Sequence, residues 1–142
     1  MEDVRTPQLG AVNARPMSPH LGIWRWHITM WGSILHRATG VILHLAAFVI
    51  AVWWALALAS GPGPYADFLA VAGSWFGRLV FFGLALSFFY HLANGVRHLV
   101  WDSGRGVEVR WANQSGAAVM IFAVAATLIV FALAWRFGGL QG

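Results

Sequence analysis

Three long runs of uncharged, mostly apolar residues dominate the pattern of this chain. Residues 38–60, 79–96 and 111–135 contain no Asp, Glu, Lys or Arg. A helix needs about 20 predominantly apolar residues to cross the hydrocarbon core of a bilayer. We therefore predict three transmembrane helices, over about residues 28–59, 75–101 and 112–135. The middle run is the shortest, and His91 interrupts it.

Two segments that favour turns or water separate these runs. Residues 60–65 are rich in glycine and proline, which together resist helix continuation, so the first helix should end there. Residues 102–110 hold two glycines and four charged side chains, which indicates a loop in water. The chain is thus predicted to be one all-α membrane domain over residues 1–142, with a polar tail over residues 1–27.

Composition supports a membrane protein and excludes several kinds of chemistry. Hydrophobic residues make up 59% of the 142 residues, charged residues make up 10%, and the mean hydropathy is +0.67. A soluble domain of this size could not bury that much apolar surface. The chain has no cysteine, so it cannot by itself form disulfides, thiolate metal sites or iron–sulfur clusters.

The arginines predict how the chain is oriented in the membrane. Seven lie in the tail, in the first turns of the first helix or around the 102–110 loop: Arg5, Arg15, Arg25, Arg37, Arg97, Arg105 and Arg110. Only Arg78 and Arg136 lie at the other side, so the tail and this loop are expected in the cytoplasm. The arginines form no continuous patch, which argues against nucleic-acid binding.

The amino-terminal tail indicates which cellular membrane contains the chain. It lacks the short apolar core of a cleavable signal peptide, so we expect the tail to be retained. It also carries Glu2 and Asp3, unlike an acid-poor mitochondrial transit peptide. We therefore predict a multi-pass protein of a bacterial inner membrane.

Polar residues at membrane depth are expensive and usually serve a function. Ser33 and Arg37 are four residues apart on the first helix, so they share a face, and His36 lies beside them. One interpretation is a site for a polar ligand. The other is a serine bonded to its own helix and an arginine that extends towards the lipid headgroups.

Histidines in the second run suggest a haem site. A neutral imidazole offers a lone pair to haem iron while its second nitrogen is oriented by a hydrogen bond. His91 is the best placed, with small residues Ala93 and Gly95 nearby, but it could equally be a buried histidine bonded to a neighbouring helix. His44 lies at nearly the same depth on the first helix, so spacing alone also permits a haem held between His44 and His91.

Two runs of residues resemble the signatures of the cytochrome b556 subunits of succinate dehydrogenase. The first comprises Arg15-Pro16-Met17, Leu21, Ile28, Ser33, His36-Arg37 and Thr39. The second comprises His91, Gly95-Val96-Arg97-His98-Leu99, Trp101-Asp102 and Gly104. Both have the spacing and the placement that this family shows, and with the three helices between and after them the resemblance covers about nine-tenths of the chain.

The resemblance implies that the chain is half of a heterodimeric helical anchor bundle in complex II. Its partners would be a second membrane anchor, an iron–sulfur subunit and a flavoprotein subunit. It also implies that His91 is one axial ligand of haem b, that the partner anchor supplies the other, and that His44 is a packing histidine. Succinate would be oxidised elsewhere in the complex, so no catalytic residue is assigned to this chain.

The same resemblance implies a ubiquinone site that uses Ser33 and Arg37. A hydroxyl and a guanidinium would donate to the quinone carbonyls, which gain negative charge on reduction. His36 and His98 would lie near the haem propionates, since a protonated imidazole pairs well with a carboxylate. Arg97 could share that role, although an arginine at the cytoplasmic interface explains it equally well.

Other assignments stay open on the sequence alone. Asp102 and Glu108 lie where protons could enter towards the quinone, but loop carboxylates are usually just solvated. The nearest alternative function is a fumarate reductase anchor that runs in the opposite direction with menaquinone. A haem-free transporter or assembly protein is the alternative from a different class.

Overall fold

The computed structural model describes residues 25–138, and its secondary structure within this range is entirely α-helical. The helices are α1 (Ile28–Ala59), α2 (Pro62–Gly73), α3 (Trp75–Asp102) and α4 (Val109–Arg136). Helices α1, α3 and α4 are long and apolar enough to cross a membrane. The prediction of an all-α membrane protein with three transmembrane helices is therefore confirmed.

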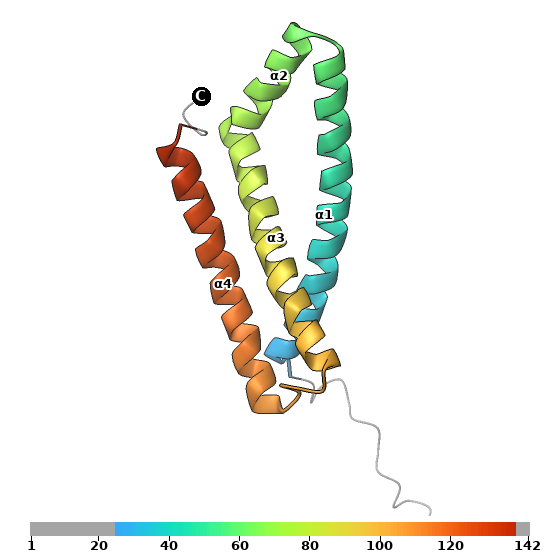
Figure 1. The fold of residues 1–142 in the computed structure, drawn as a ribbon, viewed down its shortest axis with the longest axis vertical. Coiled ribbons are helices and arrows are strands. Elements are labelled where there is room, and N and C mark those ends of the chain that lie inside the picture. Colours follow the sequence, from blue (N-terminus) through green and yellow to red (C-terminus); the bar gives the residue numbers. More distant parts are fainter. Residues whose placement is uncertain (1–24, 139–142) are drawn as a thin grey trace, which may run out of the picture.

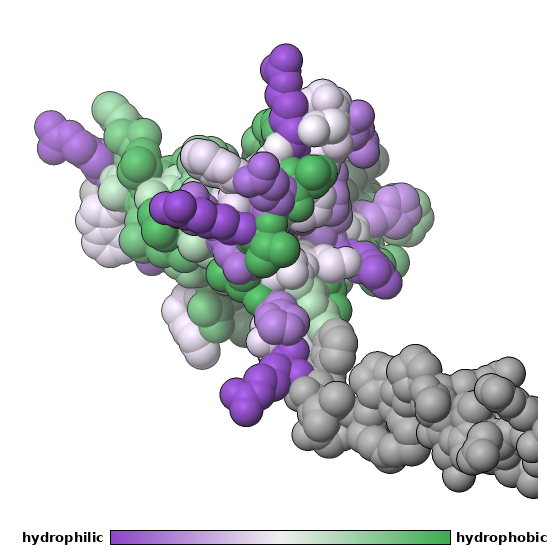
Figure 2. Space-filling view, turned by 90° about the horizontal axis from the view of Figure 1, so that it is seen from below, coloured by the Kyte–Doolittle hydropathy of each residue, from purple (hydrophilic) through white to green (hydrophobic). Residues whose placement is uncertain are grey.

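The three long helices run alternately up and down, and α3 lies between α1 and α4 in Figure 1. The start of α1 and the connection from α3 to α4 meet at the lower end, whereas α2 lies at the upper end. Purple, hydrophilic side chains gather at the lower end in the end-on view of Figure 2. This arrangement places the beginning of α1 beside the 102–110 loop, as the predicted orientation requires.

Helix α2 was not predicted, because the glycine and proline cluster was interpreted only as a helix end. Gly61 has a φ of 104°, a value that favours glycine, and it ends α1. Pro62 then opens α2, where its fixed φ suits the first turn and its missing N–H costs nothing. The same cluster therefore ends one helix and starts another.

A tight junction joins α2 to α3. The Ser74 hydroxyl accepts a hydrogen bond from the Gly77 amide at 3.1 Å and donates to the Val71 carbonyl at 2.6 Å. A Cβ atom at Gly77 would lie only 2.3 Å from that carbonyl oxygen. Only glycine therefore fits this position, and the direction of α2 relative to α3 is fixed.

Few large side chains are buried, as expected for a chain surrounded by lipid. Tyr90, Val119 and Ala123 form a small core between α3 and α4. The Tyr90 hydroxyl also donates to the Gly32 carbonyl on α1 at 2.8 Å. Lipid tails are as apolar as leucine, so close packing and hydrogen bonds between helices must hold the bundle together.

Candidate functional site

Three histidines come together where α1 meets α3. The His36 and His91 rings stack with centroids 4.0 Å apart and an angle of 11° between their planes. The His98 ring lies 5.2 Å from the His36 ring. We call these three residues the histidine cluster. It unites the residues that the sequence predicted to lie near haem from two helices far apart in the sequence.

The hydrogen bonds of His91 define its tautomer. Its Nδ1 lies 3.1 Å from the His36 carbonyl oxygen and 3.3 Å from the Thr39 hydroxyl. A carbonyl oxygen only accepts, so Nδ1 carries a proton, and in the neutral imidazole Nε2 then keeps its lone pair. The Thr39 hydroxyl already donates to backbone carbonyls of α1, at 2.7 Å for Leu35, and so it does not compete for this role.

A glycine on α1 makes room for the His91 ring. A Cβ atom at Gly40 would lie 3.0 Å from Cε1 of His91, closer than nearly all real contacts of this kind. Gly40 was not predicted to be a site residue, and Thr39 was predicted only as a member of the first signature. The available signal was a glycine within an apolar helix, which often marks a close approach between transmembrane helices.

His36 has an unused polar atom in the same place. Its Nδ1 is buried and has no hydrogen-bond partner within residues 25–138. A buried polar atom without a partner is costly, so it points to a group from outside this part of the chain. An imidazole that can present a lone pair on Nε2 and a buried, unpaired ring nitrogen beside it fit an iron porphyrin.

Ser33 and Arg37 meet on the exposed side of α1. Nη2 of Arg37 donates a hydrogen bond to the Ser33 hydroxyl at 3.2 Å. The Arg37 side chain is exposed, and Ser33 is partly buried. Two polar groups one helical turn apart therefore present donors close to the histidine cluster, since His36 is the residue before Arg37.

Arg97 is buried against α4, with 7% of its surface exposed. Its Nε donates to the Ser115 hydroxyl at 2.9 Å, and its Nη2 donates to the Ala112 carbonyl at 2.7 Å. Its Nη1 donates to Oδ1 of Asn94 at 3.2 Å, and its guanidinium lies 4.0 Å from the centre of the Trp101 ring. Sequence reasoning missed these partners, because their proximity depends on how α3 and α4 pack.

The remaining candidates lie outside the histidine cluster. His44 is exposed on α1, and Asp102 and Glu108 are exposed at the lower end. No group of three metal-ligating side chains that could hold a metal ion occurs in the described part of the chain.

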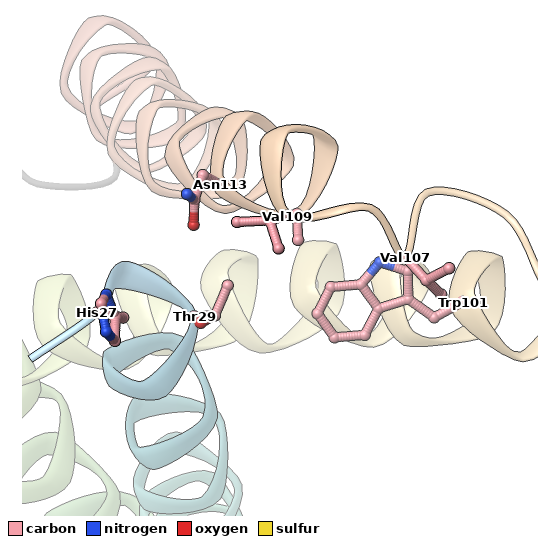
Figure 3. A pocket seen from close by; sticks show the side chains of 7 residues that line it. His27, Thr29, Trp101, Val107, Val109 and Asn113 are labelled. Carbon is pink, nitrogen blue, oxygen red and sulfur yellow. The ribbon is translucent and has the colours of Figure 1, made fainter.

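A surface pocket of about 490 Å³ opens at the lower end (Figure 3). His27 and Thr29 line it from the start of α1, and Trp101 and Asn113 line it from α3 and α4. None of the three clustered histidines lines this pocket.

Similarity to known proteins defines the class of this protein. The family model for transmembrane subunits of succinate dehydrogenase and fumarate reductase matches residues 11–130. The chain therefore belongs to this family, and the family predicted from the two signatures is confirmed. It is accordingly a transmembrane subunit of an oxidoreductase complex.

Individual relatives carry succinate dehydrogenase names. The succinate dehydrogenase cytochrome b556 subunit of Paracoccus denitrificans is 38% identical over 120 residues, which cover 82% of this chain and 92% of that protein. The subunit of the same name from Rickettsia felis is 37% identical over 119 residues, covering 84% and 92%. The mitochondrial succinate dehydrogenase cytochrome b560 subunit of Sus scrofa is 37% identical over 115 residues, covering 78% and 66%.

Proposed function

We propose that this chain is the haem b-carrying membrane anchor of a succinate dehydrogenase, complex II. The observation that carries the proposal is the oriented His91 ring, whose Nδ1 proton is directed at the His36 carbonyl at 3.1 Å. That hydrogen bond leaves Nε2 with its lone pair, which is the state in which an imidazole binds iron. The cytochrome names of the relatives support the same assignment.

The remainder of the complex must supply what the chain lacks. A second membrane anchor would contribute the other axial ligand, as the resemblance of the two signatures to this family implies. Iron–sulfur and flavoprotein subunits would dock at the lower end, where hydrophilic side chains gather (Figure 2). Bound haem b would supply a one-electron carrier within the bilayer.

Ser33 and Arg37 would bind ubiquinone at the edge of this site. The guanidinium is permanently charged and has donors beyond the one that it gives to Ser33. These donors would stabilise negative charge that develops on a quinone carbonyl during reduction. The exposure of Arg37 leaves room for the ligand.

His36 and His98 would border the haem propionates. The unpaired Nδ1 of His36 is the specific support for this role. The three nitrogens of Arg97 each have a partner on α3 or α4, so we assign Arg97 to helix pairing. A propionate contact by Arg97 stays a prediction from the resemblance.

The proposed setting is a bacterial inner membrane with the amino terminus in the cytoplasm. The arginine distribution and the common lower end of α1 and the α3–α4 connection support this orientation (Figure 1). A fumarate reductase anchor is the second candidate, because the family description names both activities. The quinone and the reaction direction separate the two.

The test begins with the affinity-tagged complex in mild detergent. We expect a b-type haem band to appear in the visible spectrum when succinate is added. If dithionite reveals no haem in a preparation that retains its partner subunits, the proposal is wrong.

The same complex tests the quinone site. We expect Ser33→Ala and Arg37→Ala each to reduce the rate of succinate-dependent ubiquinone reduction by about 100-fold, the usual effect of losing one donor to a developing oxyanion. Haem content should remain near that of the native complex. The matched controls are Ser60→Ala and Arg136→Ala, which remove the same groups at the opposite end of the bundle. Unchanged quinone reduction in Arg37→Ala would refute the assignment.

A further inference from the structure

Asn94 occupies an unusual position for an amide side chain. It lies on α3 with 1% of its surface exposed. Its Oδ1 is 3.2 Å from Nη1 of Arg97, and its Nδ2 is 3.3 Å from Nε2 of His98. It therefore connects a buried arginine to a member of the histidine cluster.

Arg97 determines which way the Asn94 amide faces. A guanidinium has donors and no acceptor, so the group that faces it must be the amide oxygen. Arg97 cannot easily turn away, because Ser115 and the Ala112 carbonyl hold its other two nitrogens at 2.9 Å and 2.7 Å. The opposite orientation of the amide would set its NH₂ group against the guanidinium.

The amide orientation in turn determines where His98 carries its proton. With Oδ1 bound to Arg97, the amide NH₂ faces Nε2 of His98 and can only donate to it. We propose that Asn94, oriented by Arg97, is a positioning residue that keeps Nε2 of His98 unprotonated. His98 is then a neutral imidazole with its proton on Nδ1.

The other groups around His98 do not reverse this assignment. The His36 ring on α1 lies 5.2 Å away, and the Trp101 ring lies 5.1 Å away in an edge-on arrangement. Neither contact supplies a carboxylate that would stabilise an imidazolium. A proton on Nε2 would point directly at the N–H of Asn94, so two donors would face each other.

The consequence for the haem site rests on the proposed function. The sequence suggested a protonated His98 that pairs with a propionate. In the proposed arrangement, His98 offers a propionate one neutral N–H donor from Nδ1 and no net charge. Arg97 thereby acts on the histidine cluster through Asn94.

The tautomer can be measured by nitrogen NMR of the complex in lipid after incorporation of ¹⁵N-histidine, with the haem reduced. A difference spectrum against His98→Gln isolates the two nitrogens of His98. We expect Nε2 at the position of an unprotonated nitrogen and Nδ1 at that of a protonated one. A protonated Nε2 in the native complex, in a neutral or a charged ring, would overturn the proposal without any Asn94 variant.

Asn94→Asp tests the role of the amide, because it replaces the donor with an acceptor of the same shape. We expect Nε2 of His98 to become protonated in this variant. The matched control is Asn113→Asp, which makes the same change at an exposed position of α4 and should leave His98 as it is. If Nε2 stays unprotonated in Asn94→Asp, Asn94 does not position the proton.

The readout is independent of the proposed function. A native complex without haem would refute the proposed function, yet the nitrogen signals of His98 would still report its tautomer.

Discussion

Helix α3 contacts α1 on one side and α4 on the other. The two contacts differ in how many of their polar groups have hydrogen-bond partners. Towards α4, two guanidinium nitrogens of Arg97 donate to Ser115 and Ala112, and the third donates to Asn94 on α3 itself. The buried Thr127 hydroxyl of α4 donates to its own helix at 2.7 Å. Towards α1, Nδ1 of His36 is buried without a partner, and Nε2 of His91 keeps a lone pair. The Arg97 nitrogens that face α4 all have partners, whereas two ring nitrogens at the α1 contact have none within residues 25–138.

This difference separates structure from function within a single helix. In a bilayer, a polar contact that is complete holds helices together, because lipid gives little hydrophobic drive for association. A contact that leaves a buried nitrogen unpaired requires a group from outside. The α3–α4 contact is thus expected to determine stability, and the α1–α3 contact to determine cofactor binding.

The strongest test of this comparison is His91→Ala. Losing a residue that only orients a metal ligand commonly weakens metal binding by about 10- to 100-fold, so loss of the ligand itself should weaken haem binding by at least about 100-fold. The measurement is haem per complex by the pyridine haemochrome assay. His44→Ala is the control, and it should keep normal haem. Normal haem in His91→Ala would refute the ligand assignment, and haem loss in His44→Ala would favour a haem held within one chain.

The second test is Arg97→Met, which should lower the stability of the complex and leave most of its haem bound. Arg97→Met leaves Oδ1 of the buried Asn94 without its donor, and an unsatisfied buried acceptor costs about 1–3 kcal/mol. The Ala112 carbonyl keeps the Ser115 hydroxyl as a donor at 3.2 Å. We expect a lower thermal unfolding midpoint for the complex, while haem per complex at low temperature falls little. A variant that loses haem as completely as His91→Ala at native stability would show that the two contacts are not separable.

The substitution with the smallest expected effect is Gly40→Ala, which tests the contact between α1 and α3. In Gly40→Ala, the new methyl group would contact Cε1 of His91 at 3.0 Å, so the ring must shift by a few tenths of an ångström. We expect a displaced haem band and an affinity for haem lower by about 10-fold. Gly95→Ala on α3 is the matched control, since its methyl group would enter open space. Equal effects of the two substitutions would show that helix propensity, and not the His91 ring, is responsible.

The long uncharged runs of the sequence were enough to predict the membrane helices. Their number follows from uncharged runs that must match bilayer thickness, which is a one-dimensional constraint. Helix α2 was missed because proline and glycine can both end a helix and begin one. In the structure, the Phe68 ring of α2 packs against the Trp53 ring of α1, with ring centroids 4.8 Å apart. That contact lies between segments whose proximity the sequence does not state.

The candidate site shows the same limit. Ser33 and Arg37 could be paired in advance, because a turn of helix brings residues four apart together. The stacking of His36 on His91 and the partners of Arg97 could not, since each depends on the rotation of one helix against another. The burial of Arg97 against α4 likewise depends on how the helices pack.

The Arg97 network also bears on how the chain is inserted into the membrane during synthesis. An arginine at the centre of a helix raises the free energy of translocon-mediated insertion by about 2.5–3.5 kcal/mol, and less near the interface. Its acceptors on α4, the Ser115 hydroxyl and the Ala112 carbonyl, leave the ribosome only after α3 is complete. The connection over residues 103–108 is short, so α4 follows α3 closely. We therefore expect α3 and α4 to enter the bilayer together as a helical hairpin, and α3 alone to be inserted poorly.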